Sequence, residues 1–488
     1  MIGRLKLLLL NNRGTRQTVT KNTFWLTISN FGGRLLRAII VIYAARTLGT
    51  EEWGVFSYAL TVAAMLTIFV DFGVGPLLTR ESSKFANDPI RRKQIISTSF
   101  YLRIVLLVIS TLLVIYGTPY VTTIEAAIPL LPIMAVIMIL DSTRDFFVSI
   151  ARSLERMEWE AFLSILTNAS VVLIGIALLQ ISASAEFMAY GYAFGIGVGT
   201  IATIYLLRKE LSGMFTHFDF KYVRLMFTAA IPFAISAILA GIMVNTDILF
   251  IGFFRSAEEV GLYSAILRII QMLYILPGII ATSSFPLFAR LAYKDDPKLR
   301  LILEKIIGTM FLIAMPLAIG GALAAGPLTE LIYGKAYLPA TASFQVLLLT
   351  LIINFPMAIL TNFIFAYNKQ KSLIVFSTLG ALSNVFLNFL FIPTFGILGS
   401  AWATFGAQAI SNTYLWFVSY KINPFSIFSY LPKIIVATAG MGAITFLGIV
   451  ADLPIWMVIL AASAFYFLIL LGLKESLVDE YRETLKLI

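Results

Sequence analysis

Uncharged apolar runs of about twenty residues follow one another along almost the whole chain, and this pattern constrains the fold more than any other feature. A helix needs about 20 apolar residues to cross the hydrocarbon core of a bilayer. Of the 488 residues, 59% are hydrophobic and only 13% are charged, which is far from the composition of soluble domains. We therefore expect an all-α polytopic membrane protein.

Charged residues and Pro, Gly and Asn punctuation divide the chain into about fourteen predicted transmembrane helices. They lie near residues 22–45, 53–78, 94–116, 126–149, 160–181, 186–207, 225–253, 259–288, 302–326, 340–366, 372–392, 397–419, 432–450 and 454–472. This division predicts six regions: a cytoplasmic segment (1–21), an N-terminal six-helix lobe (22–207), a cytoplasmic linker (208–224), a C-terminal six-helix lobe (225–420), an extra helix pair (421–472) and a cytoplasmic tail (473–488).

The basic residues are distributed very unequally between alternate connections. Of 36 Lys and Arg residues, 29 fall on one side of the predicted membrane, three on the other and four inside spans. Because basic residues in short connections stay cytoplasmic, both termini are predicted to lie in the cytoplasm. The net charge of +10 is then explained by membrane topology rather than by nucleic-acid binding.

The residue inventory excludes several kinds of chemistry. The chain has no cysteine and a single histidine, His217, so disulfides, thiolate metal sites and histidine-based zinc sites are excluded. No catalytic residue, metal or cofactor is predicted. The N-terminal apolar run, residues 7–10, is too short for a signal peptide, so an uncleaved N-terminus is expected.

An internal repeat links the two halves of the chain. Residues 51–60 (EEWGVFSYAL) open the second predicted span, and residues 258–267 (EEVGLYSAIL) open the eighth, at an offset of 207. Six spans separate the copies, so both copies have the same orientation. The halves are therefore expected to be related by a twofold axis along the membrane normal. Chance recurrence in an apolar chain is the alternative.

Both copies of the repeat, with their neighbours, also match a known family pattern. Residues 45–56 (ARTLGTEEWGVF) and 71–81, followed by 245–252 (NTDILFIG), 259–265 and the Phe285-Pro286 pair, resemble the polysaccharide-flippase branch of the multidrug/oligosaccharidyl-lipid/polysaccharide exporter superfamily. The resemblance covers nearly the whole chain. It implies two six-helix lobes around a central cavity, alternating access, and export of lipid-linked oligosaccharides. The extra pair of spans after residue 420 is found in only some members.

Five polar residues of the first span recur at spacings of four, three, four and three: Thr23, Thr27, Asn30, Arg34 and Arg37. This periodicity places them on one helical face. A charged side chain in mid-span costs about 2.5 to 3.5 kcal/mol on insertion scales, so it needs a partner, water or a function. We expect this face to line a wet cavity, where Arg34 and Arg37 bind an anionic diphosphate or acidic sugar with the help of Asn30.

A structural role is the alternative for Arg34. The carboxylate of Asp71 enters the second span at a comparable depth and could form an ion pair with Arg34. Asp71 is therefore a candidate structural or coupling residue. Arg103, in the third span, lies near the cytoplasmic end and is expected to reach the cytoplasm by extending its side chain.

The second half offers its own candidates. Arg268 and Gln271 lie one turn apart on the eighth span and are predicted to bind substrate. Asp247, near the outer end of the seventh span, belongs to the family pattern and is a candidate coupling residue. An aspartate at a membrane interface can equally cap a short outer turn, and both interpretations stay open.

These features predict a flippase that translocates a polyprenyl-pyrophosphate-linked oligosaccharide across the cell membrane. The expected partners are this lipid-linked oligosaccharide, membrane lipids and a coupling ion, Na⁺ or H⁺, with no nucleic acid. The alternative is a cation-coupled multidrug antiporter of the same superfamily, which would favour carboxylates in the lobes, whereas the deep charges here lean cationic. A membrane-embedded glycosyltransferase or hydrolase is disfavoured because the longest connection, residues 208–224, is too short to hold a sugar nucleotide.

Overall fold

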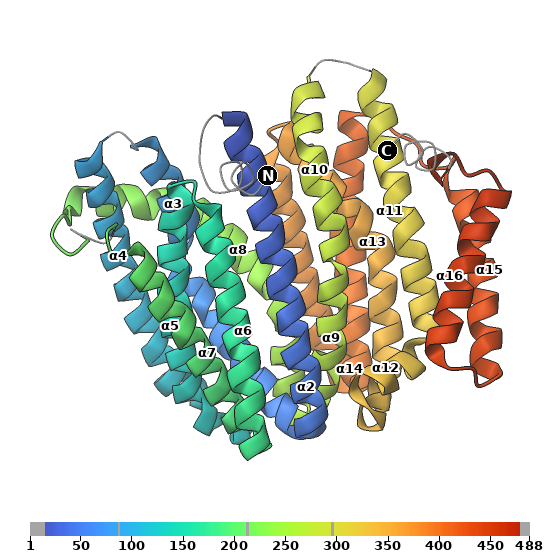
Figure 1. Cartoon of the computed structure of the whole chain (residues 1–488), viewed down its shortest axis with the longest axis horizontal. Coiled ribbons are helices and arrows are strands. Elements are labelled where there is room, and N and C mark those ends of the chain that lie inside the picture. The colour runs from blue at the N-terminus through green and yellow to red at the C-terminus, as the bar shows by residue number, and fades with distance from the viewer. Residues whose placement is uncertain (1–14, 86–87, 211–213, 294–296, 479–488) are drawn as a thin grey trace, which may run out of the picture. The chain divides into compact units, whose positions relative to one another are not determined.

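A computed structural model describes residues 15–85, 88–210, 214–293 and 297–478 (Figure 1). All regular elements in these ranges are helical, which confirms the prediction of an all-α fold. In chain order they are α2 (Thr15–Asp71), α3 (Val74–Lys84), α4 (Pro89–Leu112), η1 (Leu113–Gly117), η2 (Thr118–Tyr120), η3 (Glu125–Leu130), α5 (Leu131–Ser153), α6 (Met157–Ile181), α7 (Ala185–Leu207), α8 (Phe220–Phe254), α9 (Ala257–Leu273), α10 (Ile275–Leu291), α11 (Pro297–Leu323), α12 (Ala325–Tyr333), η4 (Lys335–Ala340), α13 (Thr341–Ala366), α14 (Gln370–Ile422), α15 (Leu431–Val450) and α16 (Ile455–Gly472).

Two of the helices, α2 and α14, each consist of two helical segments joined at a bend. Among the described residues, twelve helices are long and apolar enough to cross a membrane, and the chain is therefore a multi-pass membrane protein. Of these, α2 and α14 each contain one glycine with a left-handed backbone, Gly49 at φ 75° and Gly396 at φ 57°. Glycine is suited to such a bend because it has no Cβ atom. Counting each of these two helices as two segments gives the fourteen spans that the sequence predicts.

The bend at Gly396 reverses the direction of the chain. A Cβ atom at Gly399 would overlap the carbonyl group of Phe391, although eight residues along a straight helix cover about 12 Å. In addition, the Ser400 hydroxyl donates a 3.0 Å hydrogen bond to the Asn388 side chain. The two halves of α14 therefore run back along each other.

The bend in α2 has the same effect. A Cβ atom at Gly175 would lie 3.0 Å from the Ile40 side chain, and Gly191 also approaches Gly175. The ring of Tyr192 lies 5.2 Å from the ring of Phe56. Residues 40 and 56 thus lie at the same level of α6 and α7, whereas a straight helix would separate them by about 24 Å.

Small residues bring α6 and α7 together. Gly191, Gly195 and Gly199 recur every four residues on α7 and face Gly175, Val171 and Thr167 on α6. A Cβ atom at Gly191 would lie 2.7 Å from the Gly175 backbone. Since lipid chains are as apolar as leucine, transmembrane helices associate through this kind of close backbone packing.

The chain divides into two compact units. Unit 1 comprises Met1–Gly261 and unit 2 comprises Leu262–Ile488. In unit 1, α8 packs against α2, α3 and α4. In unit 2, α13 packs against α10, α11 and α14. The boundaries of the six predicted regions remain predictions.

The two copies of the repeated sequence meet inside unit 1. A Cβ atom at Gly54 would overlap the carbonyl oxygen of Ala257, and one at Gly261 would overlap that of Thr50. At the offset of 207, Gly54 corresponds to Gly261 and Thr50 to Ala257. The glycine of each copy is therefore in backbone contact with the residue four positions earlier in the other copy, and the missing Cβ atom makes this approach possible.

The last two helices pack on one another and on α11. Figure 1 shows α15 and α16 side by side at the red end of the chain. The Tyr466 hydroxyl donates a 2.8 Å hydrogen bond to the carbonyl oxygen of Leu312 on α11. The Lys433 ammonium lies 3.8 Å from the Glu475 carboxylate. The Tyr466 hydrogen bond thus fixes the pair to α11, and the Lys433–Glu475 ion pair joins α15 to the segment that follows α16.

Candidate functional site

The polar stripe of α2 lies on its exposed face. Thr23, Thr27, Arg34 and Arg37 are all exposed, while Ile40 on another face is fully buried. The side chain of Asn30 lies outside the described residues. A face that carries two arginines and is not covered by protein needs water around it, because lipid would leave the guanidiniums unsolvated.

A glycine and an asparagine position Arg37. The Nε and Nη2 atoms of Arg37 both lie 3.4 Å from the Oδ1 atom of Asn168 on α6. The Asn168 amide in turn donates a 2.8 Å hydrogen bond to the Ser164 carbonyl oxygen. A Cβ atom at Gly33 would lie 3.1 Å from the Asn168 side chain, so the glycine lets α2 approach α6 here. Arg37 therefore has a neutral partner that orients it without neutralising its charge.

Asp71 pairs with Arg103 and not with Arg34, so the alternative of a structural Arg34–Asp71 pair is wrong. The Arg103 Nη1 atom lies 2.9 Å from Asp71 Oδ1, and its Nε donates a 3.1 Å hydrogen bond to Ser142. Arg103 is only 4% exposed, and its guanidinium also lies over the Phe146 ring. The prediction that Arg103 extends to the cytoplasm is therefore wrong as well. Both errors have the same cause. The sequence predicts how deep each residue lies in the membrane, but not which residues of other helices are its neighbours. In the structure α4 packs beside the end of α2, and this brings Arg103 to Asp71.

Unit 1 pairs several other charges of its helices. Arg144 lies 2.8 Å from Asp141 and 2.9 Å from Asp145, all on α5. Two further pairs join neighbouring elements: Arg152 with Glu160, and Lys21 with Glu158. In the part of the chain that the structure describes, Arg34 and Arg37 form no ion pair. These two arginines are thus the cations of the α2 face without an ion pair, although Arg37 interacts electrostatically with the Asp141 carboxylate.

Unit 2 contains the predicted pair Arg268 and Gln271 and, separately, a polar network formed by Tyr274, Thr350, Asn354 and Gln408. The Arg268 Nη1 atom donates a 3.3 Å hydrogen bond to Gln271 Oε1. Just after the end of α9, the Tyr274 hydroxyl lies 2.9 Å from the Thr350 hydroxyl. Asn354 donates to the Tyr274 oxygen at 2.8 Å.

The network extends from α13 to α14 through residues that the sequence analysis missed. The Asn354 amide also donates a 2.6 Å hydrogen bond to Gln408 Oε1. Thr350 and Asn354 lie four residues apart on α13, as do Thr404 and Gln408 on α14, and this one-turn spacing of polar residues was the available signal. Uncharged hydrogen-bonding groups of this kind can hold sugar hydroxyls as well as each other.

Asp247 is buried within α8, with 2% of its surface exposed. Its role as a coupling residue remains a prediction.

The candidate binding residues are divided between the two units. Arg34 and Arg37 belong to unit 1, and Arg268 and Gln271 to unit 2. No group of three or more His, Cys, Asp or Glu residues that could hold a metal ion occurs among the described residues.

Comparisons with known proteins identify what the chain is similar to. The sequence profile of a family described as "Polysaccharide biosynthesis protein" matches residues 19–292. A Shigella flexneri protein named as an O-antigen transporter is 24% identical over 401 residues, which cover 79% of this chain and 93% of that protein. A Haloferax volcanii protein named as the low-salt glycan biosynthesis flippase Agl15 is 21% identical, over 81% of this chain and 82% of that protein.

Among solved structures, the fold is similar to that of the lipid II flippase MurJ in an inward closed conformation. The TM-score is 0.76 at 16% sequence identity, and the match covers 92% of this chain and 99% of that one. At this identity the likeness concerns the fold.

Proposed function

Since the chain belongs to the polysaccharide biosynthesis protein family, we propose that it is a flippase for a polyprenyl-pyrophosphate-linked oligosaccharide. It moves the glycan head from the cytoplasmic to the outer leaflet while the lipid tail stays in the bilayer. Relatives named for O-antigen transport and for glycan flipping support this assignment, and they do not favour the alternative of a multidrug antiporter.

The observation that carries the proposal is that Arg34 and Arg37 are exposed and form no ion pair within the described part of the chain. The other arginines discussed in unit 1 have carboxylate partners, whereas these two lie exposed one turn apart. Planar guanidiniums at this spacing bind the two phosphates of a diphosphate by paired hydrogen bonds. In unit 2, the pair Arg268 and Gln271 and the pair Asn354 and Gln408 supply further polar groups for the glycan.

The transport step breaks no covalent bond, so the chain acts by binding and by alternating access. The duplicated segments support two lobes that exchange an inward-open and an outward-open arrangement. We place the protein in the cell membrane with both termini in the cytoplasm, on the basis of the 29 to 3 partition of basic residues. Na⁺ or H⁺ drives the cycle, with Asp247 and Asp71 as the candidate coupling residues.

Transport into proteoliposomes tests the proposal. The purified chain is reconstituted with a polyprenyl-diphosphate oligosaccharide whose glycan carries a fluorophore. A membrane-impermeant quencher then measures how fast the glycan changes leaflet. We expect exchange that depends on the protein and responds to an imposed Na⁺ or pH gradient. If the reconstituted, folded protein left the glycan in its original leaflet and instead extruded a cationic dye, the antiporter alternative would replace the flippase.

A further inference from the structure

Asn168 of α6 holds one edge of the Arg37 guanidinium. The Nε and Nη2 atoms of Arg37, which form its side-on edge, both donate to the Asn168 Oδ1 atom at 3.4 Å. A guanidinium has five N–H donors, and these contacts use two of them. Nη1 and the second hydrogen of Nη2 form the end-on edge, from which no residue in the described part of the chain accepts. Arg37 is therefore fixed at one edge and open to a ligand at the other.

The orientation of the Asn168 amide follows from its two contacts. The Ser164 carbonyl oxygen can only accept and the Arg37 guanidinium can only donate. The Nδ2 atom therefore faces Ser164, at 2.8 Å, and the Oδ1 atom faces Arg37. Asn168 is 8% exposed, and a Cβ atom at Gly33 would lie 3.1 Å from its Nδ2 atom. The amide thus fits a place that a glycine of α2 leaves open.

The uncharged partner distinguishes Arg37 from three other arginines of unit 1. Arg103, Arg144 and Arg152 each lie within 2.9 Å of a carboxylate oxygen. A carboxylate in place of the amide would pair with Arg37 in the same way and would repel a phosphate group. Asp141 on α5 interacts electrostatically with Arg37, but its ion pair, at 2.8 Å, is with Arg144.

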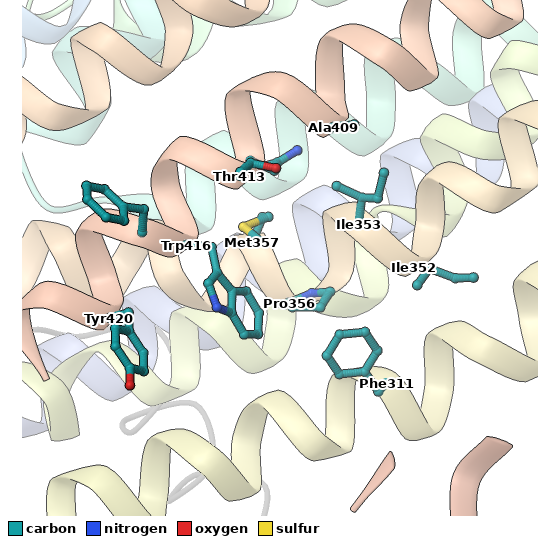
Figure 2. Close-up of a pocket in the computed structure, with 11 residues that line it drawn as sticks. Phe311, Ile352, Ile353, Pro356, Met357, Ala409, Thr413, Trp416 and Tyr420 are labelled. Carbon is teal, nitrogen blue, oxygen red and sulfur yellow. The ribbon is translucent and has the colours of Figure 1, made fainter. Parts of the chain in front are cut away.

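An apolar groove of unit 2, between α11, α13 and α14, offers no comparable group. Its volume is about 650 Å³, and none of the eleven residues that line it is charged. Figure 2 shows Phe311, Pro356 and Trp416 among its side chains. A surface of this kind does not attract a diphosphate, so the groove is not a candidate site for an anionic head group.

We propose that Asn168 is a positioning residue whose neutrality makes the site at Arg37 selective for an anionic head group. The amide holds the side-on edge of the guanidinium, and two oxygens of the substrate's diphosphate accept from the end-on edge. Gly33 lets the amide reach this position. The inference rests on the proposed function, which supplies a diphosphate-linked substrate.

Three probes with the same chain and different head groups test this selectivity: farnesyl diphosphate, farnesyl monophosphate and farnesol. The full chain is embedded in nanodiscs of phosphatidylcholine, a lipid without net charge, and empty nanodiscs correct for partitioning into the lipid. The wild-type protein should bind the diphosphate most tightly and farnesol most weakly. A purely structural role of Asn168 would instead make its variants lose all three probes alike.

Asn168→Asp replaces the amide by a carboxylate of the same shape. It should weaken diphosphate binding about tenfold, because the new carboxylate pairs with Arg37 and repels the phosphates. Monophosphate binding should fall less, and farnesol binding should not change. Gln180→Glu adds the same charge at an exposed position of α6, about 18 Å further along the helix, and is the matched control. It should bind all three probes like the wild-type protein.

Two glycines of α2 provide a test that leaves Asn168 in place. Gly33→Ala puts a methyl group 3.1 Å from the amide, so it should displace the amide and weaken diphosphate binding about threefold. Farnesol binding should again stay the same. Gly32→Ala meets the Ile165 side chain at an ordinary contact distance of 3.6 Å and should bind like the wild-type protein. This pair decides the matter alone if Asn168→Asp does not fold.

Three outcomes would overturn the inference while the flippase assignment stands: wild-type affinity of Asn168→Asp for the diphosphate, equal losses of all three probes in the folded variants, or the same losses in the two controls. A wild-type protein that moves no lipid-linked glycan in proteoliposomes would instead contradict the proposed function itself.

Discussion

At the scale of single residues, five arginines of unit 1 fall into two groups. Arg103, Arg144 and Arg152 have carboxylate partners, and their positions are explained by these pairs. Arg34 and Arg37 form no ion pair within the described part of the chain, and Arg37 is held by the neutral amide of Asn168. A guanidinium that is oriented but not ion-paired is suited to an anionic ligand.

Substitution of Arg34 and Arg37 should therefore affect transport more than folding. Lysine keeps the charge but loses the planar donor fork, so transport per folded molecule should fall about tenfold for each Lys variant and further for each Ala variant. The measurement is the proteoliposome assay, normalised to monodisperse protein. Arg91→Ala, at an exposed position near the start of α4, is the control and should transport normally. Normal rates for Arg34→Ala and Arg37→Ala would remove both residues from the binding site.

The Arg103–Asp71 pair should behave in the opposite way. Arg103→Ala leaves Asp71 without its cationic partner, and removal of one partner of a buried pair costs about 3 to 5 kcal/mol. We expect the lower end of this range, because the Asp71 side chain is 31% exposed. The yield of folded protein and its melting temperature should fall, and the double variant Asp71→Asn with Arg103→Gln should recover much of the loss. Additive losses in the double variant would show that the two residues act independently.

The polar stripe of α2 was predictable from the sequence because helical periodicity relates residues of the same helix. The exposure of Arg34 and Arg37 agrees with it. The partners were not predictable: Asp71 pairs with Arg103 from α4, and Asn168 from α6 holds Arg37. Such contacts depend on which helices become neighbours, and spacing along one chain segment does not contain that information.

At the scale of helices, the number of spans was predictable because bilayer thickness fixes the length of an apolar run. The reversals at Gly49 and Gly396 occur where the sequence analysis placed short connections. The tight packing of α6 on α7 was missed, although the four-residue recurrence of Gly191, Gly195 and Gly199 was present in the sequence. The sequence analysis uses glycine only as a marker of where spans end, although glycines at this spacing also form a packing surface within a helix.

Two glycines of α7 provide a matched test of this packing. A methyl group at Gly191 would press on the backbone of Gly175, whereas one at Gly197 would meet only the Leu140 side chain at 3.7 Å. Gly191→Ala should therefore destabilise the protein by about 1 to 3 kcal/mol through overpacking, and Gly197→Ala should change stability little. Thermal unfolding in detergent measures both. Equal melting temperatures for the two variants would show that backbone contact does not hold α6 and α7 together.

At the scale of the whole molecule, the predicted topology can be mapped by labelling because the chain has no cysteine. Cysteines introduced by Glu186→Cys and Asp452→Cys should react with a membrane-impermeant maleimide from outside the cell. Arg91→Cys should react only after the membrane is permeabilised. Labelling of residue 186 or 452 from the cytoplasmic side alone would contradict the orientation that the basic residues predict.

Alternating access predicts that the repeated segments change their contact during transport. The Thr50 hydroxyl lies 3.5 Å from a Glu258 carboxylate oxygen, so a short bifunctional methanethiosulfonate reagent should join cysteines at these two positions through reducible disulfides. The cross-linked double variant should stop transporting, and a reducing agent should restore the rate. The two single-cysteine variants serve as controls. Full transport by a fully cross-linked sample would show that this contact persists throughout the cycle.

The glycine contact between the repeated segments also bears on the origin of the chain. Gly54 of the first copy contacts Ala257 of the second, and Gly261 of the second contacts Thr50 of the first. Since Gly54 corresponds to Gly261 and Thr50 to Ala257, the same contact is made twice with the copies exchanged. This reciprocity is the signature of an isologous interface, in which two identical subunits meet across a twofold axis. The contact is what gene duplication and fusion would leave behind if the ancestor were a homodimer of single repeats. In that ancestor a single substitution altered both sides of the interface at once, whereas in the fused chain each side can now diverge on its own.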